Sequence, residues 1–154
     1  MCKRARRHLD PHLDLARDIF EHVQSEFRHL ESHITTPPHI EGDLKLSFPT
    51  QPGLVFNLSM ILDCNEFRLE VGPHWHMHYL ADCDEEVDAF FDNVVGLLDG
   101  RYRIVERLRN DSPRHAELQV PDKEGWKTTC TMGRGGLPFG EISERIIQNH
   151  PSPS

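Results

Sequence analysis

The sequence predicts one α+β domain, in which an antiparallel sheet of about six strands carries its helices mainly on one face. Three observations support this class. Segments that alternate apolar and polar residues, as strands do, are joined by short turns rich in Gly, Pro, Asn and Asp. Two longer segments repeat apolar residues every three or four positions, as amphipathic helices do. With a short helix at the end, the element order is α-βββ-α-βββ-α.

The length of the chain fits one domain. It has 154 residues, of which 37% are hydrophobic, and a chain of this size buries roughly 70% of its unfolded surface. We expect the domain to span residues 11–149. We expect disorder in the basic segment of residues 1–10 and in the tail of residues 150–154, which lack an apolar pattern that could pack.

The first helix is expected from Pro11 to Ile34. Proline suits the first turn of a helix, and Asp10 suits the cap before it. The apolar face of this helix consists of Ala16, Phe20, Val23, Phe27, Leu30 and Ile34. The segment TTPPH that follows ends the helix, because proline lacks the amide donor and restricts the residue before it.

Three strands follow in the first half. The first two are expected at Leu44–Phe48 and Leu54–Leu62, and the third is expected as one bent strand from Phe67 to Tyr79. In the third, every odd position is apolar, aromatic or proline, and every even position is polar or glycine. A two-residue hairpin at Gly72 and Pro73 would place apolar residues opposite histidines, so we expect a bulge there instead.

The turn before this strand predicts a register. With Cys64 and Asn65 as the hairpin loop, apolar residues face one another along both strands. The expected pairs are Leu62 with Phe67, Met60 with Leu69, Leu58 with Val71, and Leu54 with Trp75.

The second half repeats the order of helix and strands. A helix from Asp84 to Leu98 starts with acidic residues that complement its dipole, and Gly100 suits its end. Strands are expected around residues 102–109, 116–120 and 126–132, before a last helix from Glu141 to Asn149. In element order the chain resembles the small acidic chaperones of bacterial type III secretion. That resemblance implies a homodimer that binds a protein partner, and it assigns no site residue.

Charge and composition argue against several classes of partner. The net charge is −8, and the body of the chain is more negative still, because residues 1–9 hold four bases and no acid. Such a body repels nucleic acid. No apolar run approaches the roughly 20 residues of a membrane span. The absence of a secretory signal and of a CxxC motif predicts a cytoplasmic protein with reduced cysteines.

The run HWHMH is the first candidate site. His74, His76 and His78 would lie on one strand face, about 6.5–7 Å apart in succession. Imidazoles suit a divalent transition metal such as zinc, although three in one row need further ligands from neighbouring strands. The available neighbours are Glu70, His115 and Glu117. The alternative is a solvated polar face of an antiparallel sheet.

A row of arginines is the second candidate site. Arg101, Arg103, Arg107 and Arg109 fall on the polar phase of one strand. If both halves join one sheet, the arginines share its open face with the histidines, and guanidinium groups there would bind an anionic ligand. The alternative is that nearby acids, such as Glu70, Glu106 and Glu117, neutralise the row.

No motif in the chain identifies a reaction, so a non-enzymatic function is favoured. The leading hypothesis is a protein- or ligand-binding module whose open polar sheet face meets a protein partner or a second copy of the chain. The alternative hypothesis is a metal-binding protein, or a metal-dependent enzyme, that uses the row of His74, His76 and His78.

Overall fold

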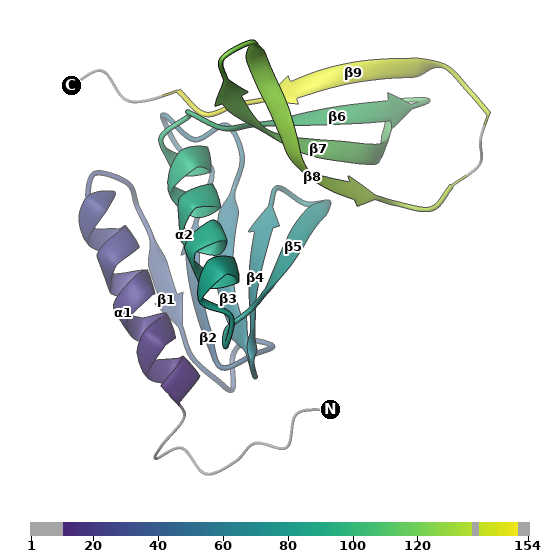
Figure 1. Ribbon diagram of the computed structural model, residues 1–154. Coiled ribbons are helices and arrows are strands. Elements are labelled where there is room, and N and C mark those ends of the chain that lie inside the picture. Colours follow the sequence, from purple (N-terminus) through teal and green to yellow (C-terminus); the bar gives the residue numbers. More distant parts are fainter. Residues whose placement is uncertain (1–10, 137–138, 151–154) are drawn as a thin grey trace.

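The computed structural model describes residues 11–136 and 139–150, and within them two helices and nine strands form an α+β fold (Figure 1). The strands make two antiparallel sheets, in the orders β1-β2-β3-β4-β5 and β8-β7-β6-β9. The predicted fold class is confirmed, whereas the single six-stranded sheet and the predicted element order are wrong. The resemblance to type III secretion chaperones depended on that order and loses its support. Residues 1–10 and 151–154 lie outside the described residues.

Both helices cover the same face of the first sheet (Figure 1). Helix α1 (Pro11–Glu26) begins where expected but ends early, and Ile34 lies in strand β1 (His33–Thr35). β-branched residues at 34–36 favour an extended backbone, and β1 pairs with β2, where Ile34 lies opposite Leu46. The helical spacing of Ile34 was therefore coincidental, and its side chain is 43% exposed.

The middle of the first sheet follows the predicted pattern. Strand β2 (Leu44–Phe48) has the expected bounds, and β3 (Leu58–Asp63) pairs with β4 (Glu66–Val71) in the expected register up to Leu58 and Val71. Residues before Leu58 form a turn instead of the expected strand, with an isolated bridge between Gln51 and Leu54. Leu54 is buried there all the same.

The expected continuous strand from Phe67 to Tyr79 is wrong, because the chain reverses at Gly72. Strand β5 (Trp75–Leu80) runs back along β4, with Val71 opposite Trp75. The connecting loop has an odd number of residues, Gly72 to His74, and therefore keeps apolar residues opposite apolar ones. The pattern correctly excluded a two-residue hairpin at Gly72 and Pro73. A hairpin with a three-residue loop forms there in place of the expected bulge. The two faces survive the reversal: odd residues of β5 are buried and even ones exposed, but Leu54 does not pair with Trp75.

Helix α2 (Asp84–Leu98) has the predicted bounds, and Gly100 follows with a φ of +80°. Left-handed backbone is a common way to end a helix, and glycine adopts it without a steric penalty. The apolar side of α2 packs on the first sheet, where Phe90 stacks on Phe67 with ring centroids 4.7 Å apart. As for membranes, no helix in the described part of the chain has the length and apolarity that a bilayer span requires.

The second sheet lies across one end of the first (Figure 1). Strands β6 (Arg103–Arg109), β7 (Ser112–Asp122) and β8 (Gly125–Gly133) form the expected meander. The predicted last helix is wrong, because β9 (Ile142–Ile147) pairs with β6 in its place. A segment with three isoleucines is a better strand than helix former, and β6 offers it an open edge.

A buried carboxylate joins the two sheets. Glu106 of β6 is 1% exposed; it accepts a hydrogen bond from the indole of Trp75 at 2.6 Å and one from Arg145 Nε at 2.7 Å. Trp75 belongs to the first sheet and Arg145 to β9, so one carboxylate holds three strands. The buried apolar side chains of both sheets and both helices form one core cluster.

Candidate functional site

A cleft of about 600 Å³ lies where the edge of the first sheet meets α2 and the second sheet. Strand β5 lines it with the consecutive residues His76 to Tyr79, and β8 lines it with Thr129 to Met132. Side chains of a strand alternate between two faces. A lining of consecutive residues therefore means that the edges of both strands, with their main-chain groups, face the cleft. The other lining residues are Ala89, Asp92, Asn93, Tyr102 and Val120.

The edge of β5 presents unpaired main-chain groups to this cleft. Ala81 donates its amide to the carbonyl of Asn65 on the β4 side at 2.8 Å. Hydrogen-bonded and non-bonded pairs alternate along an antiparallel ladder, so Tyr79 and Met77 also bond to β4. The N–H and C=O groups of His76 and His78 then point away from β4. Within residues 11–136 and 139–150, β5 is the last strand of its sheet and pairs with β4 alone.

The same rule gives the orientation of β8. Arg134 donates its amide to the carbonyl of Arg114 on β7 at 2.8 Å. By alternation, Met132 and Cys130 bond to β7, and the main-chain groups of Thr131 point outward. Two free sheet edges thus border one cleft, on strands that approach each other closely at one end.

Three polar side chains of the cleft have a pKa that is raised. Burial raises the pKa of Tyr79 to about 12, although a hydrogen bond from Asn93 acts in the opposite direction. Burial also raises the pKa of Tyr102, and so does its hydrogen bond to Asp92, at 2.6 Å. The Cys130 thiol has a pKa raised by burial and stays protonated at neutral pH. A raised pKa keeps the Cys130 thiol and the two tyrosine hydroxyls in the protonated form, which is the less nucleophilic one.

The structure brings two of the three predicted histidines to the cleft. The rings of His76 and His78 lie 5.1 Å apart between centroids, and Glu66 lies 3.4 Å from His78 Nδ1. His74 lies in the hairpin loop, and its Nδ1 contacts the guanidinium of Arg134 at 2.8 Å. Glu70 lies opposite His76 in the sheet. The other two expected ligands, His115 and Glu117, contact each other on the second sheet at 3.4 Å.

The histidines do not have the close spacing of a complete set of metal ligands, and the group of side chains that does is not a metal site. Among the described residues, only Asp43, Asp63 and Cys64 place three ligand atoms within 4.8 Å of one another. Cys64 is disulfide-bonded and offers no thiolate. The expectation that all cysteines are reduced is therefore wrong at Cys64, whereas Cys83 and Cys130 are free.

The predicted arginine row occupies a different sheet from the histidines, so the expected common cationic face does not form. Arg101, Arg103 and Arg107 each have a close partner. Arg101 precedes β6 and contacts Asp99 at 2.6 Å. Arg103 lies 4.1 Å above the ring of Trp126.

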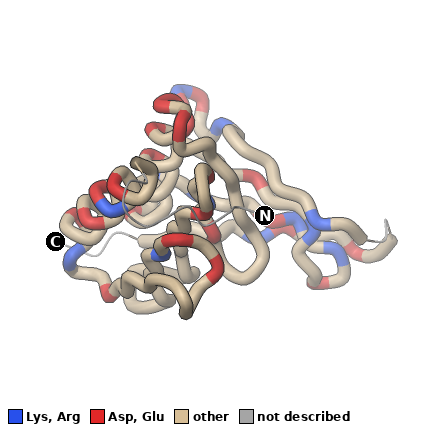
Figure 2. Tube along the Cα trace, turned by 90° about the horizontal axis from the view of Figure 1, so that it is seen from below, with Lys and Arg blue, Asp and Glu red and all other residues tan. Residues whose placement is uncertain are grey.

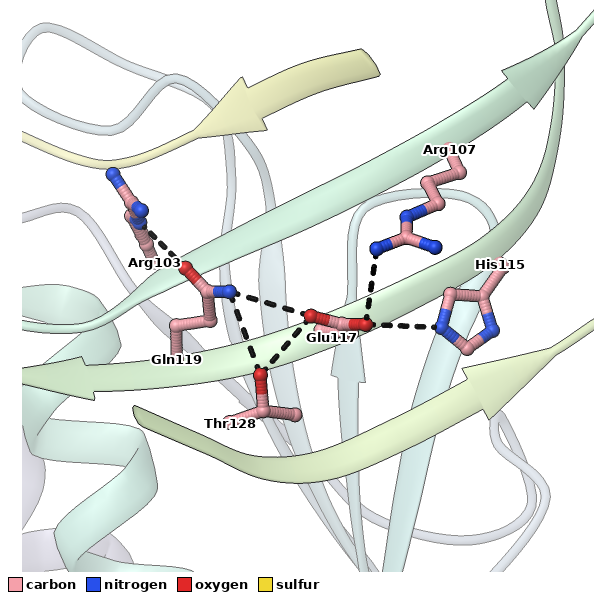
Figure 3. Close-up of polar contacts among 6 residues, drawn as sticks. All are labelled: Arg103, Arg107, His115, Glu117, Gln119 and Thr128. Atoms are coloured by element: carbon pink, nitrogen blue, oxygen red, sulfur yellow. Dashed lines mark hydrogen bonds and ion pairs between the residues drawn. The ribbon is translucent and has the colours of Figure 1, made fainter. Parts of the chain in front are cut away.

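The third paired arginine belongs to a polar network on the outer face of the second sheet (Figure 3). Glu117 at its centre accepts hydrogen bonds from Thr128, Gln119 and His115, and pairs with Arg107 at 3.6 Å. Burial opposes ionisation of Glu117, but these bonds and the Arg107 charge outweigh it and lower its pKa. Of the acids named as possible partners of the row, Glu117 pairs with Arg107 in this network.

Sequence patterns missed most of the cleft. The alternation identified the faces of β5 but not its position at the edge of a sheet, and nothing in the sequence placed β8 beside it. One signal was available for the junction, because Glu106 interrupts the apolar phase of its strand. No family model, curated protein or solved structure matches the chain.

Proposed function

We propose that the protein is a non-enzymatic binding module that takes an extended segment of a protein partner as an added strand on β5. The observation that carries the proposal is the pair of outward-facing main-chain groups at His76 and His78, beside a cleft that can hold the segment. Exposed sheet edges pair readily with extended peptides, and main-chain hydrogen bonds supply much of the affinity.

The edge is a better binding surface than the polar face of the first sheet. On that face, Glu70 lies 3.1 Å from Arg68 and 4.0 Å from Lys45, so the charges are paired within the sheet. Ile61, between Lys45 and Arg68 in the register, is 2% exposed. The face therefore offers few free groups to a ligand, whereas the edge offers donors and acceptors in a concave setting.

A peptide that retains its side chains but lacks amide donors tests the proposal. A hexapeptide of alternating threonine and valine is expected to bind and to protect the amides of His76 and His78 from hydrogen exchange. The same peptide with every amide N-methylated is expected not to bind, because it can neither donate to the edge nor approach it. Equal binding by the two peptides would contradict strand addition.

A variant in the protein gives the complementary test. His78→Pro removes an outward amide and leaves the β4 ladder intact, and it is expected to abolish peptide binding. His78→Ala keeps the amide and is the matched control, expected to bind as the natural chain does. Light scattering shows whether two copies pair instead. A dimer that protects these same amides without peptide would assign the edge to a second copy and refute the proposal.

Metal binding by His76 and His78 is the second candidate function, and the 5.1 Å separation of their rings favours it. With Glu66 they would provide two imidazoles and one carboxylate, a ligand set that suits zinc, if their ligand atoms moved closer together than the 4.8 Å spacing that they do not meet here. If the site binds metal, zinc raises the thermal midpoint of the natural chain but not that of His76→Ala. No zinc-dependent shift in the natural chain would exclude this function.

A further inference from the structure

Resting on the proposed function, we infer that the bound segment is basic, with arginine or lysine at every second position, on the side that faces α2. The inference combines the charge of the cleft with the geometry of an added strand. Three further observations support it. The described lining of the cleft has no Lys or Arg, and the Asp92 carboxylate has acceptor positions for further hydrogen bonds. Side chains of a strand added to β5 would also alternate between the two faces of the sheet.

The cleft is acidic on the side of the helices. Among the described residues that line it, Asp92 is the only acid, and there is no Lys or Arg. Helix α2, which forms one wall, has five Asp and Glu and no base. Residues 11–102 carry 17 acids against five bases, and Figure 2 shows red acidic positions along the helices. Such a field attracts a cationic segment and raises its association rate.

Asp92 has room for a cation. Among the residues that the structure describes, its carboxylate accepts a hydrogen bond from Tyr102. An ionised carboxylate has about four acceptor positions and can accept the two parallel bonds of a guanidinium. The nearby Arg101 donates its Nε to Asp99 and interacts with Asp92 through charge.

The position of the basic residues follows from antiparallel pairing, which every strand pair described here uses. Peptide residues that bond to His76 and His78 lie opposite them, so their side chains share the imidazole face. The intervening peptide residues point to the other face, toward Asp92 and Asn93. Basic residues therefore occupy the intervening positions, and uncharged ones lie beside the imidazoles.

Labelled hexapeptides and fluorescence anisotropy test the charge. A peptide of alternating arginine and valine is expected to bind about tenfold more tightly than one of threonine and valine. A glutamate and valine peptide is expected to bind more weakly than either. A peptide with the same arginines in one block controls for non-specific attraction, and is expected to bind no better than the threonine peptide.

Two variants locate the effect. Asp92→Asn, which can still accept the Tyr102 hydrogen bond, is expected to remove most of the arginine advantage while the threonine peptide binds unchanged. Asp18→Asn removes the same charge from the exposed side of α1, outside the cleft, and is expected to leave both affinities nearly unchanged. Equal losses in the two variants would overturn a local site at Asp92.

N-methylation of the arginine–valine peptide tests which of its residues direct their amides toward β5. Methyl groups on the valine amides, which face β5, are expected to abolish binding, and methyl groups on the arginine amides are expected to be tolerated. The reverse result would overturn the placement. If all the unmodified peptides bind equally, the inference fails and strand addition stands; if none binds, both proposals fail.

Discussion

At the scale of residues, Glu117 shows how a polar sheet face is stabilised without a ligand. Glu117→Gln removes the charge that four neighbours share (Figure 3). It is expected to lower the free energy of unfolding at pH 7 by about 1.5–3 kcal/mol, the value of hydrogen bonds to an ionised group. Urea denaturation at pH 7 measures this, with Glu124→Gln in an exposed turn as the control.

The pH dependence of this effect has a definite sign. Because the pKa of Glu117 is lower in the folded state than its usual 4.5, ionisation stabilises the fold above that value, and the stabilisation is lost as the pH falls through the folded pKa. The difference between Glu117→Gln and the natural chain should therefore shrink as the solution is acidified below pH 4.5. A difference that stays constant would show that the carboxylate charge is not the cause.

The pKa of each cleft tyrosine is raised, whereas that of Glu117 is lowered, so the tyrosines have the opposite effect on the pH dependence of stability. Tyr79, with its pKa raised to about 12 by burial, is neutral in the folded chain at pH 10, where an unfolded tyrosine is half ionised. Since its folded pKa is above the unfolded one, it stabilises the fold below pH 10, and this is lost as the pH rises toward 12. Ultraviolet absorbance should show little tyrosinate at pH 10 until the chain unfolds. Half of the full signal in folded protein at that pH would contradict burial of the cleft tyrosine.

At the scale of elements, the sequence predicted what one segment buries but not which strand it joins. The buried and exposed faces of residues 67–80 agree with the prediction, because a period of two depends only on the alternation of side chains along a strand. The reversal at Gly72 was not predicted, because a two-residue loop would place Val71 opposite His74, whereas the three-residue loop that forms places it opposite Trp75. A helix was wrongly predicted at the end of the chain because the spacing of the three isoleucines of β9 is compatible with a helix as well as with a strand. The pairing with β6 decides for the strand.

The Gly72 loop gives a prediction at this scale. Gly72 has a φ of +60°, and a Cβ there would meet no atom within 4 Å. Gly72→Ala should therefore cost about 1–2 kcal/mol from backbone strain alone. Gly133→Ala, at a glycine that also has free space but no left-handed φ, is the matched control and should cost much less. Equal costs in urea denaturation would show that the loop conformation is not the reason.

At the scale of the whole molecule, two sheets make one core, and a buried carboxylate joins them. Composition and pattern predicted the α+β class, antiparallel pairing and α2. They could not predict two sheets, because the strand order depends on contacts far apart in the chain. The cleft arises from that arrangement, so most of its residues carry no local signal in the sequence. His76 and His78 are the exceptions, because they lie on the polar face of a strand that alternation predicts.

The junction is testable through the two tryptophans. Trp75→Phe removes the indole donor to Glu106 and is expected to cost about 1–3 kcal/mol, because the buried acceptor loses a partner. Trp126→Phe, at a side chain 39% exposed, is the control and should cost well below that. If the two variants unfold at the same urea concentration, the bond at the junction does not hold the sheets together.

The free edge of β5 is tested most directly by hydrogen exchange of its amides, resolved by nuclear magnetic resonance in the protein without peptide. Alternation along the ladder predicts slow exchange at Met77 and Tyr79 and fast exchange at His76 and His78. Slow exchange at all four amides would contradict the account, because the edge would then already be paired.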